Sequence, residues 1–236
     1  MVRTDRKRRY GFLIAGLIAA LALACLASGA FGSFGPFGSF GLFGSLPASS
    51  PNRTAGHAEP TNGDEVVTLV NGDAVTLKEF KARMPRLRGE IMMYCQQNYG
   101  LDPNESTFWS ASCGGKSSLE RLKEATLRLL EEDRIREQAA VKAGLHAAIG
   151  YDAFLQGWET ENRERARRVA AGQVIFGPRE FSESAYYQYV VANTVLALKQ
   201  WLQEQKGETN YERWIDEQLE QATIELNRQL YEKIAL

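Results

Sequence analysis

Hydrophobic positions along the chain change their spacing several times, and each change marks a different kind of segment. From residue 11 to residue 31 they form an almost unbroken run that contains no charge. From residue 66 onward they recur at the spacings typical of strands and helices. The chain therefore divides into a signal or anchor segment (1–31), a linker (32–63) and a folded body (64–236).

The body opens with a strand pattern. Residues 66–70 (VVTLV) are apolar and largely β-branched, and Asn71-Gly72 after them is a strong hairpin signal. Residues 73–75 are expected to return as a second strand, and residues 223–226 alternate like a third. Because an isolated hairpin is marginally stable in water, we expect this third strand to pair with residues 66–70 and so join the two ends of the body.

Helical patterns fill the sequence between these strands. Capping boxes are predicted at Thr76 with Glu79 and at Ser117 with Glu120. Pro85 lies within the first helical pattern and is expected to kink or split it. Helices are expected over residues 76–98, 117–143, 152–171, 182–206, 210–219 and 227–234. The predicted fold class is mainly α, with a small β-sheet that pairs the N- and C-terminal strands of the body.

The N-terminal segment resembles a membrane-targeting sequence. Residues 1–10 carry five basic side chains and one acid, and the 21 residues from Gly11 to Phe31 approach the ~20 needed to span a bilayer. Cys25 suggests a lipoprotein signal, although Ala22 occupies the usual position of a bulky residue. Lipidation at Cys25, an uncleaved transmembrane helix and simple cleavage all remain open. Each places the body outside the cytoplasm, on the extracytoplasmic face of a bacterial cell envelope.

The linker has two parts of different composition. Residues 29–46 place phenylalanine at every third position from Phe31 to Phe43 among many glycines, which disfavour a stable helix. This part is interpreted as a linker at the membrane surface, with self-association or client contact as the alternative. Residues 47–63 are rich in proline, serine, asparagine and glycine, as in a flexible tether.

Charge and cysteine content restrict the class of protein further. Beyond residue 10, acidic residues outnumber basic ones by five, which argues against nucleic-acid binding. Cys95 and Cys113 are disulfide candidates in an oxidising compartment. A bridge between them would close a loop of 17 intervening residues, worth roughly 3 kcal/mol. Two independent thiols are the alternative, since spacing does not show that the side chains face each other.

Catalytic and ligand-binding patterns are weak. Gly114–Ser117 (GGKS) lacks the preceding glycine and strand of a phosphate-binding loop. Cys113 and His146 give no clear nucleophile and base, and two histidines provide little for a metal. The charged runs at 131–134 and 161–168 are interpreted as solvated helix faces. No catalytic, cofactor-binding or metal-ligating residues are predicted, and we do not expect an enzyme.

Aromatic residues are more numerous than a thin helical core requires. Most are expected to be core residues, but a minority exposed in a cleft between helices would bind extended peptides. The candidates for this role are Phe108, Trp109, Trp158 and Tyr187.

Three segments together resemble the SurA/PrsA-like N-terminal domain family. Residues 65–80 (EVVTLVNGDAVTLKEF) resemble its opening strand, turn and capped helix. Residues 129–145 (LLEEDRIREQAAVKAGL) resemble its next helix, and residues 214–226 (WIDEQLEQATIEL) resemble its closing helix and strand. The three segments occur in the order of the family and span most of residues 64–236.

The resemblance implies an extracytoplasmic chaperone or foldase that holds unfolded clients, often with an inserted parvulin-type prolyl isomerase domain. Only residues 172–180 stand where that domain would be, so isomerase activity is not expected. The chain is predicted to be a membrane-anchored chaperone-like protein that binds unfolded polypeptides in an apolar helical cleft, without catalysis or ATP. The alternatives are an envelope adaptor for one specific partner and a prolyl isomerase.

Overall fold

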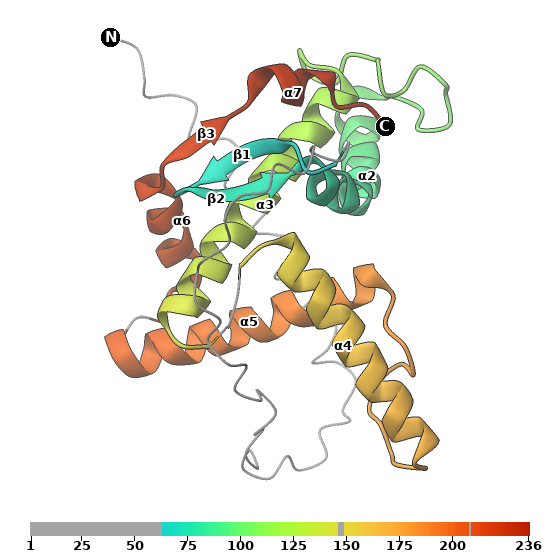
Figure 1. The fold of residues 1–236 in the computed structure, drawn as a ribbon. Helices are drawn as coiled ribbons and strands as arrows, with labels where there is room; N and C mark the ends of the chain where they lie inside the picture. Colours follow the sequence, from blue (N-terminus) through green and yellow to red (C-terminus); the bar gives the residue numbers. More distant parts are fainter. Residues whose placement is uncertain (1–62, 146–148, 208) are drawn as a thin grey trace, which may run out of the picture. The chain divides into compact units, whose positions relative to one another are not determined.

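A computed structural model describes residues 63–145, 149–207 and 209–236 of the chain (Figure 1). All described residues belong to one compact unit of the chain. The predicted anchor with Cys25 lies outside the described residues, as does the linker except for Gly63. Among the described helices, none combines the length and apolar character needed to cross a membrane.

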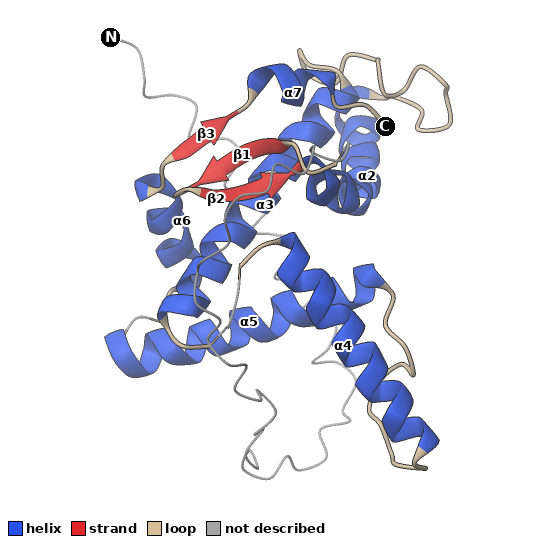
Figure 2. Ribbon diagram, viewed as in Figure 1, coloured by secondary structure: helices blue, strands red, loops and turns tan. Residues whose placement is uncertain are grey.

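The described part is mainly helical with one small antiparallel sheet, as predicted (Figure 2). The elements are β1 (Val66–Val70), β2 (Asp73–Thr76), α2 (Leu77–Tyr99), α3 (Ser118–Lys142), α4 (Tyr151–Ala170), α5 (Glu183–Lys206), α6 (Tyr211–Gln221), β3 (Ile224–Leu226) and α7 (Arg228–Lys233).

The sheet joins the two ends of the folded body. Its strand order is β2-β1-β3, and both pairings are antiparallel, with Thr68 opposite Leu226 in the second. The Thr68 hydroxyl donates to the carbonyl oxygen of Glu225 at 3.1 Å. The Asn71 backbone N–H donates to the carbonyl oxygen of Thr223 at 2.8 Å. The predicted pairing of the C-terminal strand with residues 66–70 is therefore confirmed.

Two predictions about the first helix need correction. The Thr76 hydroxyl accepts from the Glu79 N–H at 3.2 Å, but the Glu79 side chain does not complete the capping box. Its carboxylate instead lies 2.7 Å from the guanidinium of Arg134, because a buried carboxylate is stabilised by a charged partner. Pro85 was expected to kink or split the helix, and a split does not occur, because α2 continues through this residue. At α3, both halves of the Ser117–Glu120 capping box form as predicted.

The hydrophobic core has two clusters that share β1 and α3. Val67 of β1 and Leu122 of α3 belong to the first cluster, with α2 and the C-terminal Ile234. Val70 of β1 and Ile135 of α3 belong to the second cluster, with α5 and α6. Since residues of β1 and α3 enter both clusters, these two elements connect the halves of the core.

Candidate functional site

The four candidate peptide-binding aromatics lie in two separate places. Phe108 and Trp109 are in the loop between α2 and α3, where their rings meet edge to face with centroids 4.9 Å apart. Trp158 is on α4 and Tyr187 on α5. Phe108 and Tyr187 are buried, at 1% and 6% exposure, so neither presents a free ring to a ligand in this structure. Trp109 and Trp158 are half-buried, and peptide contact by them stays a prediction.

Trp158 and Tyr187 belong to a unit that we call the α4–α5 arm: helices α4 and α5 and the loop between them, residues 151–206. Within α4, Tyr151 is the one buried residue, whereas α3 buries eleven. The Trp158 indole N–H donates to the carbonyl oxygen of Phe181 at 2.7 Å, and the Asn162 amide donates to the same oxygen. Half-buried aromatic and amide groups of α4 therefore hold the loop residue Phe181, just before the start of α5.

Arg83 of α2 connects the body to both helices of the arm. Its guanidinium lies 2.8 Å from the carboxylate of Glu183 at the start of α5. It also lies over three aromatic rings, at 5.3 Å from Tyr151, 4.6 Å from Phe154 and 4.1 Å from Tyr187. Cation–π contacts of this kind are worth ~2 kcal/mol when desolvated. Because Tyr151 and Phe154 are on α4, one side chain of the body contacts both helices of the arm.

A buried ion-pair network reaches the start of the arm by a second route. Arg134 of α3 is 1% exposed and pairs with Glu79 of α2 at 2.7 Å and with Glu137. The Glu137 carboxylate also accepts from the backbone N–H of Gly150 at 3.0 Å. Gly150 directly precedes α4 and has a positive φ of 100°, a conformation that favours glycine. The network thus links α2, α3 and the first residue before α4.

Burial dominates the electrostatics of this network. It raises the pKa of Glu79 to about 7, although the neighbouring Arg134 acts in the opposite direction. Burial also raises the pKa of Glu137, against the lowering effects of Arg134 and the Gly150 N–H. The pKa of Tyr187 lies well above its usual value, because the ring is buried and its hydroxyl donates to Asp133.

These contacts correct the expectation that the charged run at 131–134 is a solvated helix face. Asp133, Arg134 and Arg136 are all buried, at 7%, 1% and 8% exposure. The physical reason is that α3 packs against α2, α5, α6 and β1, so its solvent-facing surface is narrow. Arg136 pairs with Asp133 at 2.7 Å and with Glu132 at 2.8 Å, which compensates its loss of hydration.

The space between these helices is not an apolar cleft. A cavity of about 30 Å³ lies there, whereas ligand-sized pockets begin at roughly 300 Å³. Its lining combines charged and apolar side chains: Glu79, Arg83, Asp133, Arg136, Glu137, Phe154, Tyr187, Val190, Val191 and Thr194. The predicted apolar cleft is therefore absent at this junction of the described helices, because ion pairs and stacked rings fill it.

The loop of the arm has the most exposed apolar side chains of the described body. Val174 and Phe176 are 85% and 88% exposed. Arg165 of α4 contacts the loop backbone: its guanidinium donates to the carbonyl oxygens of Phe176 at 2.9 Å and Pro178 at 2.8 Å. The same guanidinium lies 4.3 Å from the centroid of the Phe181 ring. We call residues 163–180 the arm tip.

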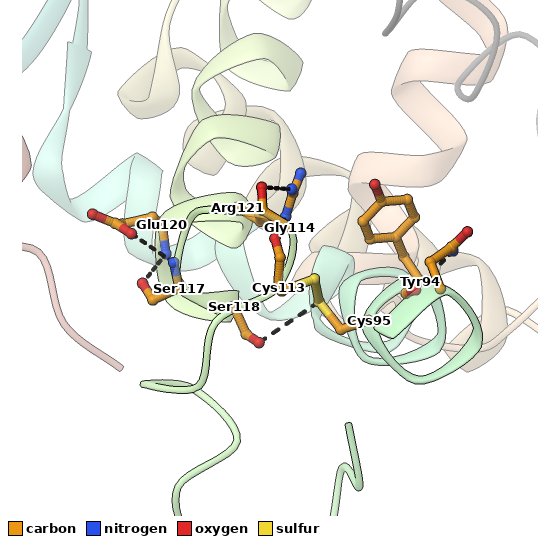
Figure 3. Close-up of a disulfide and its surroundings, with 9 residues drawn as sticks. Tyr94, Cys95, Cys113, Gly114, Ser117, Ser118, Glu120 and Arg121 are labelled. Atoms are coloured by element: carbon orange, nitrogen blue, oxygen red, sulfur yellow. Dashed lines mark hydrogen bonds between the residues drawn. A yellow bond between two sulfur atoms is a disulfide. The ribbon is translucent and has the colours of Figure 1, made fainter. Parts of the chain in front are cut away.

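A disulfide joins α2 to the loop that precedes α3. The Sγ atoms of Cys95 and Cys113 are 2.09 Å apart, and both residues are fully buried (Figure 3). The Arg121 guanidinium donates to the carbonyl oxygens of Cys113 and Gly114, the latter at 2.8 Å. These contacts fix the end of the loop directly before the helix start. The segment Gly114–Ser117 thus serves as the approach to α3 in this structure.

The described part of the chain leaves two kinds of chemical centre to consider, a metal site and a paired nucleophile and base. It holds no group of three or more His, Cys, Asp or Glu side chains that could bind a metal. His57 and His146 lie outside the described residues, so the pairing of His146 with Cys113 is not tested. Sequence reasoning did not single out Arg83, Arg134 or Arg165; the spacing of Arg165 and Glu161 in the helix indicated only an ordinary i,i+4 pair.

Comparison with known proteins gives one informative relative. The chain is 28% identical over 132 residues to a protein of Bifidobacterium longum subsp. longum described as a chaperone for lacto-N-biosidase. The match covers 54% of this chain and 46% of that protein, so the chain matches less than half of the relative's length. No family model and no solved structure matches the chain.

Proposed function

We propose that this chain is a chaperone-like protein that binds non-native or extended polypeptides reversibly. The observation that carries the proposal is the arm tip, where Val174 and Phe176 remain 85% and 88% exposed while Arg165 donates to the backbone carbonyl oxygens of Phe176 and Pro178. The similarity to a protein described as a chaperone supports the same class. A rigidly presented apolar group loses little entropy on binding, which favours contact with a partner.

Binding would consist of burial of client side chains, without chemistry. Each buried methylene contributes about 0.8 kcal/mol, so a few contacts at the arm tip give weak and reversible association. This mode of binding requires no ATP, cofactor or metal. The protein is proposed to be non-catalytic, and the short loop at residues 172–180 in place of an isomerase domain supports this proposal.

The SurA/PrsA-like organisation and the location of the protein belong to the same proposal. The pairing of β1 with β3, which joins the two ends of the body, supports the organisation. The basic and apolar residues of 1–31 support a membrane anchor, with lipidation at Cys25 as one form of it. The buried disulfide supports an oxidising, extracytoplasmic compartment.

Protection of an unrelated protein from aggregation tests the central proposal. We expect the full chain to suppress light scattering of a chemically unfolded protein on dilution. The double variant Val174→Ser/Phe176→Ser should suppress it several-fold less, and Leu236→Ser, at a 55% exposed apolar residue outside the arm, should match the wild type. Equal protection by wild type and double variant would contradict the role of the arm tip. No protection by the wild type would contradict the proposed function.

Catalysis is tested separately with a proline-limited refolding reaction. The full chain is expected to leave the slow phase unchanged at substoichiometric concentration, because binding alone does not lower the isomerisation barrier. Acceleration of that phase would identify a prolyl isomerase.

The printed name of the relative favours a second candidate, a protein dedicated to one partner. That relative is described as a chaperone for a single enzyme. A dedicated chaperone or envelope adaptor would bind one partner tightly and would leave the aggregation of unrelated proteins unchanged. The same scattering assay with several unrelated proteins therefore distinguishes the two candidates.

A further inference from the structure

The arm tip is strongly basic in a chain that is slightly acidic overall. Residues 163–180 contain five arginines and two glutamates, a formal charge of +3, whereas the whole chain carries −1. The exposed Val174 and Phe176 lie within the same segment. The exposed apolar pair and this excess of positive charge therefore lie in the same segment of the sequence.

The ion pairs at the tip leave part of this charge uncompensated. Glu164 is shared by Arg167 at 3.7 Å and Arg168 at 3.2 Å, so one carboxylate faces two guanidiniums. Within the described residues, Arg163 and Arg179 have no carboxylate partner, and both are exposed. Two to three guanidiniums are thus available to an anionic partner.

Helix stabilisation accounts for only some of these arginines. Arg167 and Arg168 lie in the last turn of α4, where positive side chains stabilise the helix dipole. Arg179 follows the loop and lies outside any helix, and Arg163 lies in the middle of α4. Neither of these two contributes to the end of the helix, and both are exposed at the tip.

We infer that the arm tip binds extended polypeptide segments in which apolar residues are followed or preceded by acidic ones. The inference rests on the proposed chaperone-like function and names its substrate class. Val174 and Phe176 bury apolar client side chains, while Arg163 and Arg179 pair with neighbouring client carboxylates. Arginine suits this role because its planar guanidinium binds a carboxylate through two parallel hydrogen bonds.

Two labelled peptides with one apolar sequence and different flanks test the inference. One peptide carries glutamate flanks and the other lysine flanks, and fluorescence anisotropy with the full chain measures both affinities. We expect the glutamate peptide to bind about five- to tenfold more tightly at low salt, as two exposed pairs allow. The difference should shrink at 0.5 M salt, since exposed charges are screened.

Matched variants assign the difference to the tip. Arg163→Gln/Arg179→Gln should remove the preference for glutamate flanks. Lys81→Gln/Arg228→Gln, at exposed positions outside the arm, should retain it. Equal affinity of the wild type for both peptides would overturn the inference and leave the proposed function intact. Absence of binding to either peptide would overturn the proposed function itself.

A lipid surface is the other anionic partner with this chemistry, and the same variants distinguish it. If Arg163→Gln/Arg179→Gln weakened binding to phosphatidylglycerol vesicles while peptide binding kept its preference for glutamate flanks, the tip would be a lipid contact and the inference would be wrong.

Discussion

The carboxylate of Glu79 lies 2.7 Å from the guanidinium of Arg134, and both side chains are almost completely buried. The pair joins the first turn of α2 to the middle of α3. Through Glu137 it also reaches the backbone of Gly150, where the α4–α5 arm begins. Burial of these charges carries a large desolvation penalty, so the contribution of each partner to the free energy of unfolding depends on the presence of the other.

Loss of Arg134 should strongly destabilise the body. Arg134→Met leaves the carboxylates of Glu79 and Glu137 without their buried cation, and a loss of about 3–5 kcal/mol is expected. Urea denaturation at neutral pH measures the effect. Arg128→Met provides the control, because Arg128 is 41% exposed on the same helix and its pair with Glu132 should contribute less than about 1 kcal/mol. Similar losses in both variants would contradict the importance of the buried network.

Stability should depend on pH through Glu79. Its pKa is raised from 4.5 to about 7 in the folded state, so the folded protein binds this proton more tightly than the unfolded chain. The contribution is therefore fully present below pH 4.5 and is lost as the pH rises through 7. Relative to Glu79→Gln, the wild type should lose about 3 kcal/mol of unfolding free energy between pH 4.5 and pH 8.

Comparison with Glu79→Gln isolates the contribution of Glu79, because the charged groups that face it, Glu137, Asp133, Arg83 and Arg134, are present in both proteins. Denaturation curves for both proteins at several pH values give the difference directly. A difference that is independent of pH would show that Glu79 keeps an ordinary pKa in the folded state.

Removal of the disulfide should destabilise the body by about 3 kcal/mol, as expected for the closure of a short loop. The test is the denaturation midpoint of Cys95→Ala/Cys113→Ala against the wild type. Reductant alone should act slowly on the native protein, because both cysteines are fully buried. An unchanged midpoint in the double variant would mean that the loop before α3 is held by the Arg121 contacts instead.

The turn at Asn71 should be sensitive to substitution for two separable reasons. Asn71 has a positive φ of 53°, its side-chain oxygen accepts from the Thr223 N–H at 2.9 Å, and its amide donates to Gln138 at 2.9 Å. Asn71→Ala should cost about 2–3 kcal/mol, and Asn71→Gly, which tolerates this φ, about 1 kcal/mol less. Thermal denaturation of both variants measures the difference, and identical losses would exclude a conformational contribution.

The arm tip should lose its order without Arg165. Arg165→Ala removes the donors to the carbonyl oxygens of Phe176 and Pro178, so the backbone NMR order parameters of residues 173–179 should fall to those of a flexible loop, below about 0.6. Arg163→Ala, at a neighbouring exposed position, should leave them unchanged. Order parameters already this low in the wild type would show that Arg165 does not order the loop.

Local chemistry made the architecture predictable. Asn71-Gly72 specifies a turn, Ser117 and Ser182 start helices, and Gly207 ends one in the left-handed conformation. Pairing of the third strand then followed, because a two-stranded sheet would have left an unstable edge. These signals depend on a few neighbouring residues, and packing did not override them.

The site could not be predicted in the same way, because burial of charge depends on tertiary neighbours. Asp133 and Arg134 have the sequence pattern of a solvated helix, yet α2 and α5 cover them. Glu79 fits a capping box by spacing, but the buried guanidinium of Arg134 offers its carboxylate a stronger partner. The sequence predicts Tyr187 as an aromatic exposed in a cleft between helices, but its ring is buried and its hydroxyl donates to the buried Asp133.

The sheet has a consequence for the order of events during synthesis. The hydrogen bond from Thr68 to Glu225 spans 157 residues of chain, so the centre strand waits for its second neighbour until the arm and α6 have already emerged. Until then β1 exposes an open backbone edge that any passing extended chain can pair with. A protein proposed to shield others from misassembly is thus itself open to wrong strand pairing while it is made. The time until β3 is synthesised sets how long this edge stays open.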